Sequence, residues 1–163
     1  SDCGLLVWKD SQLQFCRLGL DRDQKFACNK IEEKFYPESI MQCSYLNKEK
    51  YIVCTQDANL NIYYSDTHRQ YLKLYGHKLP VLCYDVASDE TLLLTGSVDK
   101  DIKLWGMDFG NFRSKLHQVH IAHSEAVTAA RFVPNTHYFF TGSKDGHIKY
   151  WDGDTHQLIL DLE

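Results

Sequence analysis

The sequence predicts an all-β fold assembled from a repeated unit of short strands. Along the chain, apolar runs rich in β-branched and aromatic residues alternate with clusters of turn-forming residues, which is the pattern of strands joined by tight turns. The same order of signals returns within residues 76–105 and 122–151: a histidine after a small residue, an alternating apolar run, Gly-Ser-x-Asp and a closing tryptophan. A fixed order of strands at a regular period indicates a repeat protein.

Four aspartates set the period of the repeat, because each precedes an aromatic residue by six positions. The pairs are Asp2 with Trp8, Asp57 with Tyr63, Asp99 with Trp105 and Asp145 with Trp151. Consecutive aspartates lie 55, 42 and 46 residues apart. A unit near 42 residues that opens with Gly-His and closes with Trp-Asp resembles the WD repeat, which forms one four-stranded blade of a β-propeller.

The resemblance implies a partial β-propeller of WD repeats, with about three and a half four-stranded blades of a larger propeller. Closure takes roughly four to eight blades, so we expect both ends of the sequence to cut through a continuing array. The expected units are 1–36, the end of one blade plus a polar insertion; 37–75, a degraded blade; and 76–120 and 121–163, two well-formed blades.

Within these units, each apolar run predicts one strand. The expected strands are 4–9 and 12–18 in the first unit; 40–45, 51–56, 60–64 and 70–75 in the second; 81–86, 92–95, 102–105 and one within 112–119 in the third; and 127–132, 138–142, 147–151 and 157–162 in the fourth. The polar stretch 19–36 explains the long first step. It predicts either an extra strand around 26–30 or a helical turn at 31–34, and either a partner-binding loop or a solvated insertion.

Polar residues in the two best copies predict a buried hydrogen-bonded network in each blade. A buried tryptophan N–H needs an acceptor, and a hydroxyl on the neighbouring strand can supply one. A histidine from the incoming loop can bind both that hydroxyl and an aspartate in the next turn. The predicted tetrads are His77, Ser97, Asp99 and Trp105, and His123, Ser143, Asp145 and Trp151. The degraded blade keeps a partial tetrad, Thr55, Asp57 and Tyr63, without a preceding Gly-His, so it should depend on apolar packing.

Charge and cysteine content limit the function classes. Lys and Arg number 18 and Asp and Glu 22, for a net charge of −4, so the chain as a whole lacks the electrostatics of a nucleic-acid-binding domain. The six cysteines have no C-x-x-C spacing and are expected to be mostly buried, reduced thiols of an intracellular protein. The sequence has no apolar run of the length of a membrane helix and no signal peptide, so no membrane contact is expected.

Three residue groups that could carry chemistry have simpler explanations. His117, His120 and His123 suggest zinc, but residues three apart on a strand point to opposite faces, and His123 is already placed in a tetrad. Asp89 and Glu90 are adjacent in a hairpin turn, where solvated residues are usual. The Ser, His and Asp of each tetrad resemble a hydrolase triad, but the serine would be bonded to a tryptophan inside the blade and is not expected to act as a nucleophile. We therefore expect no enzyme activity, no cofactor, no metal and no small-molecule substrate.

Residues outside the blade pattern favour one branch of WD proteins. Segments 74–81, 105–110, 132–134 and 139–141 are similar to the tandem-propeller WD subunit (Utp-twelve type) of the UtpB subcomplex of the small-subunit processome. The resemblance implies a non-catalytic scaffold for U3 snoRNP-dependent 18S pre-rRNA processing and ribosome biogenesis in the nucleolus of the nucleus. It also implies other WD-repeat subunits as partners, with U3 small nucleolar RNA and pre-rRNA reached through the assembled particle. The alternative is a stand-alone WD adaptor that binds a peptide or modified tail.

Three lysines recur beside the predicted tetrads. Lys78 follows a Gly-His, and Lys100 and Lys144 flank tetrad aspartates. Equivalent positions of successive blades lie side by side, so the three lysines are candidates for a basic strip that contacts phosphates without reading base sequence. The alternative is that they keep solvent-facing turns soluble.

Overall fold

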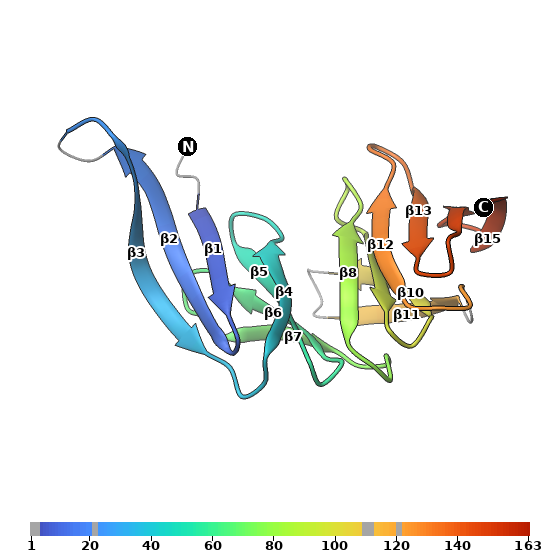
Figure 1. Ribbon diagram of the computed structural model, residues 1–163, viewed down its shortest axis with the longest axis horizontal. Helices are drawn as coiled ribbons and strands as arrows, with labels where there is room; N and C mark the ends of the chain where they lie inside the picture. The colour runs from blue at the N-terminus through green and yellow to red at the C-terminus, as the bar shows by residue number, and fades with distance from the viewer. Residues whose placement is uncertain (1–3, 21–22, 109–112, 120–121) are drawn as a thin grey trace.

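The computed structural model describes the chain except residues 1–3, 21–22, 109–112 and 120–121, and it describes side chains outside 108–121. The described part contains fifteen strands and no helix. The strands form four antiparallel sheets, which we call the first to fourth blades, and in each blade the strands lie in chain order. The blades follow one another from the N-terminal to the C-terminal end without closing into a ring (Figure 1). The predicted all-β, partial propeller is confirmed.

The bounds of the strands agree closely with the predicted ones. The first blade contains β1 (Gly4–Lys9), β2 (Gln12–Leu20) and β3 (Phe26–Phe35). The second contains β4 (Ile40–Tyr45), β5 (Lys50–Thr55), β6 (Leu60–Tyr64) and β7 (Gln70–Leu74). The third contains β8 (Val81–Val86), β9 (Leu92–Ser97), β10 (Ile102–Asp108) and β11 (Arg113–Val119). The fourth contains β12 (Val127–Phe132), β13 (Tyr138–Ser143), β14 (Ile148–Asp152) and β15 (Gln157–Leu162).

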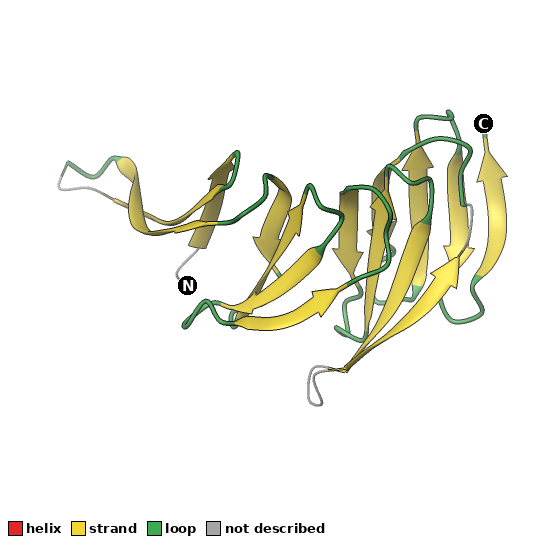
Figure 2. Cartoon of the chain, turned by 90° about the horizontal axis from the view of Figure 1, so that it is seen from below, coloured by secondary structure: helices red, strands yellow, loops and turns green. Residues whose placement is uncertain are grey.

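The polar insertion forms a strand rather than a helical turn. β3 pairs with β2 from Phe26 opposite Leu20 to Phe35 opposite Gln12, with a bulge at Ile31. A bulge on an outer strand twists its free edge and hinders pairing with another chain. The predicted extra strand is therefore confirmed and is longer than expected, while the helical turn at 31–34 is wrong. The β2–β3 hairpin extends outward at the N-terminal end of the array (Figures 1 and 2).

An apolar cluster fills the space between each pair of consecutive blades. Between the first and second blades it includes Leu13, Phe15, Tyr51 and Val53. Between the second and third it includes Ile52, Ile62, Leu93 and Trp105. Between the third and fourth it includes Leu94, Leu104, Phe139 and Trp151. Each closing tryptophan of the last two blades thus packs against the blade before it, and its burial removes a large apolar surface from water.

Trp8 does not take the corresponding place in the first blade. It pairs directly with Leu13, and residues directly opposite each other share one face of a sheet. Trp8 therefore lies on the face toward the second blade, the following one, and its side chain stays 40% exposed. Its spacing from Asp2, which lies outside the described residues, matches the repeat without the same packing role.

Gly96, in the Gly-Ser-x-Asp signature of the third blade, lies at a very close approach between blades. A Cβ atom at this position would lie 2.6 Å from Cγ1 of Val127 and 2.7 Å from Sγ of Cys83. At Gly142, the equivalent residue of the fourth blade, the nearest atom is Cβ of Ala129 at 3.6 Å. The glycine is therefore required by packing where a following blade lies against it, not by the strand itself.

Candidate functional site

A buried chain of hydrogen bonds runs through the third blade. His77 Nδ1 lies 3.0 Å from Oδ2 of Asp99, and His77 Nε2 lies 2.8 Å from Oγ1 of Thr95. The indole Nε1 of Trp105 donates to the same Thr95 oxygen at 3.1 Å. A carboxylate only accepts, so Nδ1 of His77 carries the proton, and Thr95 donates to the neutral Nε2. The chain therefore runs from Trp105 through Thr95 and His77 to Asp99.

The fourth blade repeats this chain with the same geometry. His123 Nδ1 lies 3.1 Å from Oδ2 of Asp145, and His123 Nε2 lies 2.9 Å from Oγ1 of Thr141. Trp151 Nε1 donates to Thr141 Oγ1 at 2.9 Å. The two networks are thus equivalent in partners and in direction.

The ionisation of both networks follows from their burial. Burial, the largest cause, lowers the pKa of His77 and His123 against the opposing effect of Asp99 and Asp145, so both imidazoles are neutral at physiological pH. Burial acts to raise the pKa of the Asp99 carboxyl, but the backbone N–H of Lys78 and the imidazole of His77 outweigh it and hold that pKa below its usual value. Each network therefore contains one buried carboxylate compensated by several donors.

The predicted serines Ser97 and Ser143 are not members of these networks, and this part of the prediction is wrong. Ser97 Oγ donates to the carbonyl of Leu79 at 2.8 Å and accepts from the N–H of Asp99. Ser143 makes the equivalent bonds, to the carbonyl of Glu125 and from the N–H of Asp145. The two serines therefore bind backbone groups of the loops around each network, and they do not accept from the tryptophans.

Strand register explains the error. Trp105 lies directly opposite Leu93, so Thr95 is the diagonal neighbour two residues along β9, within reach of an indole. Ser97 lies four residues along, or about 13 Å at the rise of a strand. Counting pairs outward from the tight turn centred on Asp99 gives this register, and that count is the sequence signal that identifies threonine.

In the second blade the predicted partial tetrad also divides. Thr55 Oγ1 donates to Asp57 Oδ1 at 2.5 Å, within the turn. Tyr63 lies elsewhere, with its ring stacked on Tyr51 at 5.3 Å between centroids. The same register puts Val53, not Thr55, opposite Asn61 and hence diagonal to Tyr63. The predicted dependence of this blade on apolar packing agrees with the buried aromatic cluster that fills the space.

A second polar network, which the sequence did not suggest, joins the insertion strand to the second blade. The hydroxyl of Tyr51 lies 3.2 Å from that of Tyr36 and 3.1 Å from Nδ1 of His68. His68 Nε2 lies 3.0 Å from Glu32 on β3. Lys34, also on β3, donates to the carbonyl of His68 at 2.6 Å. β3 is thus bonded across the boundary between the first and second blades.

The three candidate lysines lie at the end of the blades that carries the tetrad histidines. The backbone N–H of Lys78 donates to Asp99, and that of Lys144 donates to the carbonyl of Ala126. Lys78 and Lys144 are exposed. The ammonium of Lys100 instead donates to the carbonyl of Ser124 at 2.7 Å and lies 3.5 Å from Glu125. Its charge is partly engaged within the protein, so Lys78 and Lys144 are the better candidates for an external anion.

A cavity of about 270 Å³ opens between the first strands of three blades. Its lining residues are Gln42, Ser44, Tyr45, Leu46, Tyr84, Asp85, Val86 and Arg131. Asp85 accepts a hydrogen bond from the N–H of Phe132 at 2.8 Å and lies 3.3 Å from Nη1 of Arg131. The buried Oε1 of Gln42 has no partner within the part of the chain that the structure describes. The Asp85 carboxylate at this cavity therefore already has two partners within the protein.

Metal binding and thiol chemistry find little support in the described side chains. No group of three or more His, Cys, Asp or Glu there could hold a metal ion. His120 and the side chain of His117 lie outside the described part, so the expectation about zinc remains a prediction.

Among the described cysteines none is in a disulfide, and burial raises the pKa of the Cys43 and Cys83 thiols to about 12. Cys28, by contrast, is exposed. No described helix could cross a membrane.

Comparison with known proteins agrees with the fold. A protein-family model for the WDR3 second β-propeller domain matches residues 9–163. Periodic tryptophan protein 2 of Arabidopsis thaliana is 30% identical over 99 residues, which are 61% of this chain and 11% of that protein. The poly(A)+ RNA export protein of Schizosaccharomyces pombe is 31% identical over 121 residues, which are 71% of this chain and 33% of that protein.

A solved structure of U3-55K matches with a TM-score of 0.70 and 20% identity, over 79% of this chain and 40% of that chain. At this identity the likeness establishes the fold alone. The chain spans between 11% and 33% of the length of the two relatives above, so it corresponds to one part of proteins of that kind.

Proposed function

Since this chain belongs to the family of the WDR3 second β-propeller domain, we propose that it is part of a non-catalytic scaffold subunit of the U3 snoRNP and small-subunit processome. In this role the protein supports 18S pre-rRNA processing in the nucleolus. Its direct partners are other WD-repeat subunits of the same subcomplex. It reaches U3 small nucleolar RNA and pre-rRNA through the assembled particle.

The observation that carries the scaffold role is that the reactive groups of the repeats are used inside the blades. Both ring nitrogens of His77 and His123 are hydrogen-bonded. The hydroxyls beside them belong to Thr95 and Thr141, each only 1% exposed. A nucleophile must reach its substrate, and these hydroxyls cannot. The repeats therefore supply a rigid body, and function is left to the loops and outer strands.

Contacts with RNA, where they occur, would use phosphates rather than bases. Lys78 and Lys144 are exposed at one end of the blades, and an ammonium is a point charge suited to a phosphate oxygen. The net charge of −4 leaves little long-range attraction to RNA. The lysines would therefore contribute once protein partners had already placed the surface against RNA.

The proposed function is tested by affinity purification and imaging of the full-length protein in its own cells. The expected result is nucleolar localisation, with other WD subunits and U3 small nucleolar RNA in the purified particle. Depletion should lower 18S rRNA while large-subunit rRNA is maintained. A cytoplasmic protein whose depletion leaves the ratio of the two rRNAs unchanged would contradict the proposal.

The lysine contacts are tested separately by RNA crosslinking in the purified particle. Replacing Lys78, Lys100 and Lys144 together by Glu should weaken crosslinking while the subcomplex stays intact. Lys100→Glu alone is the matched control, because its ammonium is already bonded to Ser124, and it should have a smaller effect than Lys78→Glu with Lys144→Glu. Unchanged crosslinking in the triple variant would assign this surface to protein partners or solvent.

The cavity between the first strands favours a second candidate function, a peptide-binding adaptor. The Asp85 carboxylate at this cavity suits a peptide that brings a basic side chain. Under this alternative, Asp85→Ala would abolish capture of such a peptide without changing particle assembly. An intact particle and normal rRNA processing after loss of the whole protein would favour the adaptor over the scaffold.

A further inference from the structure

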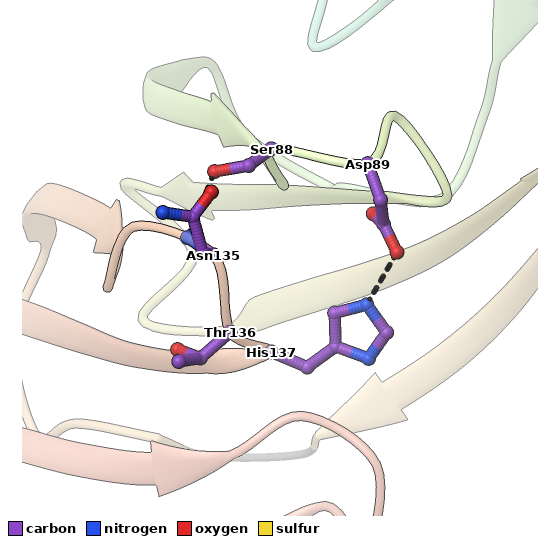
Figure 3. Close-up of a pocket in the computed structure, with 5 residues that line it drawn as sticks. All are labelled: Ser88, Asp89, Asn135, Thr136 and His137. Atoms are coloured by element: carbon purple, nitrogen blue, oxygen red, sulfur yellow. Dashed lines mark hydrogen bonds and ion pairs between the residues drawn. The ribbon is translucent and has the colours of Figure 1, made fainter.

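Three turns from two blades meet at His137, at the end of the blades opposite the tetrads. Figure 3 shows the contact between two of these turns, from His137 to Asp89. His137, in the β12–β13 turn, has Nε2 2.9 Å from Oδ2 of Asp89 in the β8–β9 turn. Its Nδ1 lies 2.6 Å from Oδ1 of Asp154 in the β14–β15 turn. One imidazole thus joins a carboxylate of the third blade to a carboxylate of its own blade.

The two bonds together require a protonated ring. Ionised carboxylates only accept hydrogen bonds, and a neutral imidazole carries a single N–H. A neutral His137 could therefore donate to Asp89 or to Asp154, but not to both. The imidazolium has two N–H groups and satisfies both partners at charge-assisted distances.

We propose that Asp89, His137 and Asp154 form a proton-operated clamp between the third and fourth blades. With His137 protonated, the three turns are held together. With His137 neutral, one carboxylate is released and the turns loosen. The device acts at the face formed by these turns and is independent of the role proposed above for the protein.

The electrostatics of the site support this direction. The hydrogen bonds that His137 donates to Asp154 and then to Asp89 raise the pKa of this histidine. The N–H of Thr91 and then His137 lower the pKa of Asp89 to about 2, so this carboxylate stays ionised at physiological pH. A histidine whose pKa is raised on folding stabilises the fold fully below its ordinary pKa, and the contribution is lost as pH rises through the raised value.

Other charged groups in these turns have partners of their own. Glu90 accepts a hydrogen bond from the side chain of Asn47 in the second blade. Asp152 accepts from the N–H groups of Asp154 and Thr155, and His156 acts on that carboxylate. Among the described residues, the carboxylates within hydrogen-bonding distance of His137 are therefore Asp89 and Asp154.

Loss of the clamp would loosen the turns without separating the blades. The N–H of Asn135 donates to Ser88 Oγ at 3.0 Å, and the N–H of Gly153 donates to the carbonyl of His137 at 3.1 Å. The apolar cluster that contains Leu94 and Phe139 holds the same pair of blades. A cavity of about 270 Å³ lined by Ser88, Asp89, Asn135, Thr136 and His137 lies at this junction. Asp89 and His137 line this cavity, so protonation of His137 would change the contacts at its edge.

The first test is hydrogen–deuterium exchange of the intact protein between pH 5.5 and 8.5, corrected for intrinsic exchange. The amides of Asn135 and Gly153 should exchange about fivefold faster once His137 is neutral, the effect expected for one lost hydrogen bond. His137→Gln should remove this pH dependence. His147→Gln is the matched control, because the ring of His147, in the same blade, contacts the carboxylate of Asp161 and, among the described residues, none from another blade. This variant should keep the pH dependence.

The second test follows the ring directly and does not depend on the stability of His137→Gln. In ¹³C-histidine-labelled protein, the Cε1 resonance of His137 should titrate above the ordinary histidine pKa, and Asp154→Asn should lower the midpoint. A midpoint at or below the ordinary value would overturn the proposal. Equal pH profiles of turn exchange in the wild-type protein and His137→Gln would overturn it as well.

Discussion

The second blade and the two blades that follow it fill the same space with different chemistry. In the third and fourth blades a tryptophan donates to a threonine within a polar chain that ends at an aspartate. In the second blade, Tyr36 precedes the first strand, and Tyr51 and Tyr63 face each other across β5 and β6. The rings of these three tyrosines pack as a cluster. A blade therefore needs this space filled with its polar atoms satisfied, not one fixed set of residues.

The two solutions differ in what else they can do. The polar chain is directional and contains titratable groups, so it is sensitive to pH and to loss of a single atom. The aromatic cluster depends mainly on buried ring surface. Its Tyr51 hydroxyl also contacts His68, which in turn contacts Glu32. The second blade is thereby connected to the insertion strand β3, a contact without a counterpart in the described parts of the other blades.

The largest expected effect is the loss of ring packing in the second blade. Tyr51 is fully buried and contacts the rings of Phe15, Tyr63 and His68. Tyr51→Ala should lower the free energy of unfolding by about 3–5 kcal/mol, as for other buried aromatic residues, measured by urea denaturation of the intact protein. Tyr75→Ala, at an exposed position, is the control and should change it by about 0.5 kcal/mol or less. Equal losses in the two variants would show that the cluster does not support the blade.

The next effect is the loss of the shared hydroxyl in the third blade. Thr95→Val keeps the volume but leaves the indole N–H of Trp105 and Nε2 of His77 without their partner. The expected cost is about 1–3 kcal/mol in the free energy of unfolding, and Trp105→Phe should fall in the same range. Val53→Thr in the second blade is the converse change, and it should not stabilise the protein, because its diagonal neighbour is Tyr63 rather than a tryptophan. A stabilising Val53→Thr would mean that the two blades are less different than described.

A smaller effect is expected for the hydroxyl that connects the aromatic cluster to β3. Tyr51→Phe keeps the ring and removes the contacts to Tyr36 and His68, at a cost of about 1 kcal/mol. Amide exchange along β3 should rise in this variant, because the hydrogen bonds that connect β3 to the second blade are weakened. Tyr63→Phe, in which the stacked ring is kept, is the control. Unchanged exchange along β3 in Tyr51→Phe would indicate that Lys34 and Glu32, through His68, hold the strand without the Tyr51 hydroxyl.

Mild acid should destabilise the third and fourth blades more than the second. The clamp at His137 has the opposite pH dependence, because it is lost as the pH rises. The folded-state pKa values of His77 and His123 are lowered mainly by burial. Their contribution to stability is complete above the ordinary pKa near 6.5 and falls as the pH drops below it, because the unfolded chain binds the proton more readily. Corrected amide exchange in β10 and β14 should therefore increase between pH 7.5 and 5.5 more than in β6. Equal increases in all three strands would contradict the assigned ionisation.

The sequence predicted most of the strands, because turn residues and apolar alternation are local signals. The repeat also pointed to His77, Asp99 and Trp105, which the structure joins in one hydrogen-bonded chain. It misplaced the hydroxyl, because Thr95 and Ser97 share a face of β9 and only the pairing with Leu93 distinguishes them. The links through Tyr51 and His137 could not be predicted, because they join residues from different blades whose approach depends on the packing of whole sheets.

The most direct test of the account is the indole N–H resonance of Trp105 in the intact protein. Threonine as the acceptor predicts that this proton is protected from exchange in the wild-type protein and in Ser97→Ala, and that Thr95→Val shifts the resonance and removes the protection. Protection that is lost in Ser97→Ala and kept in Thr95→Val would contradict it.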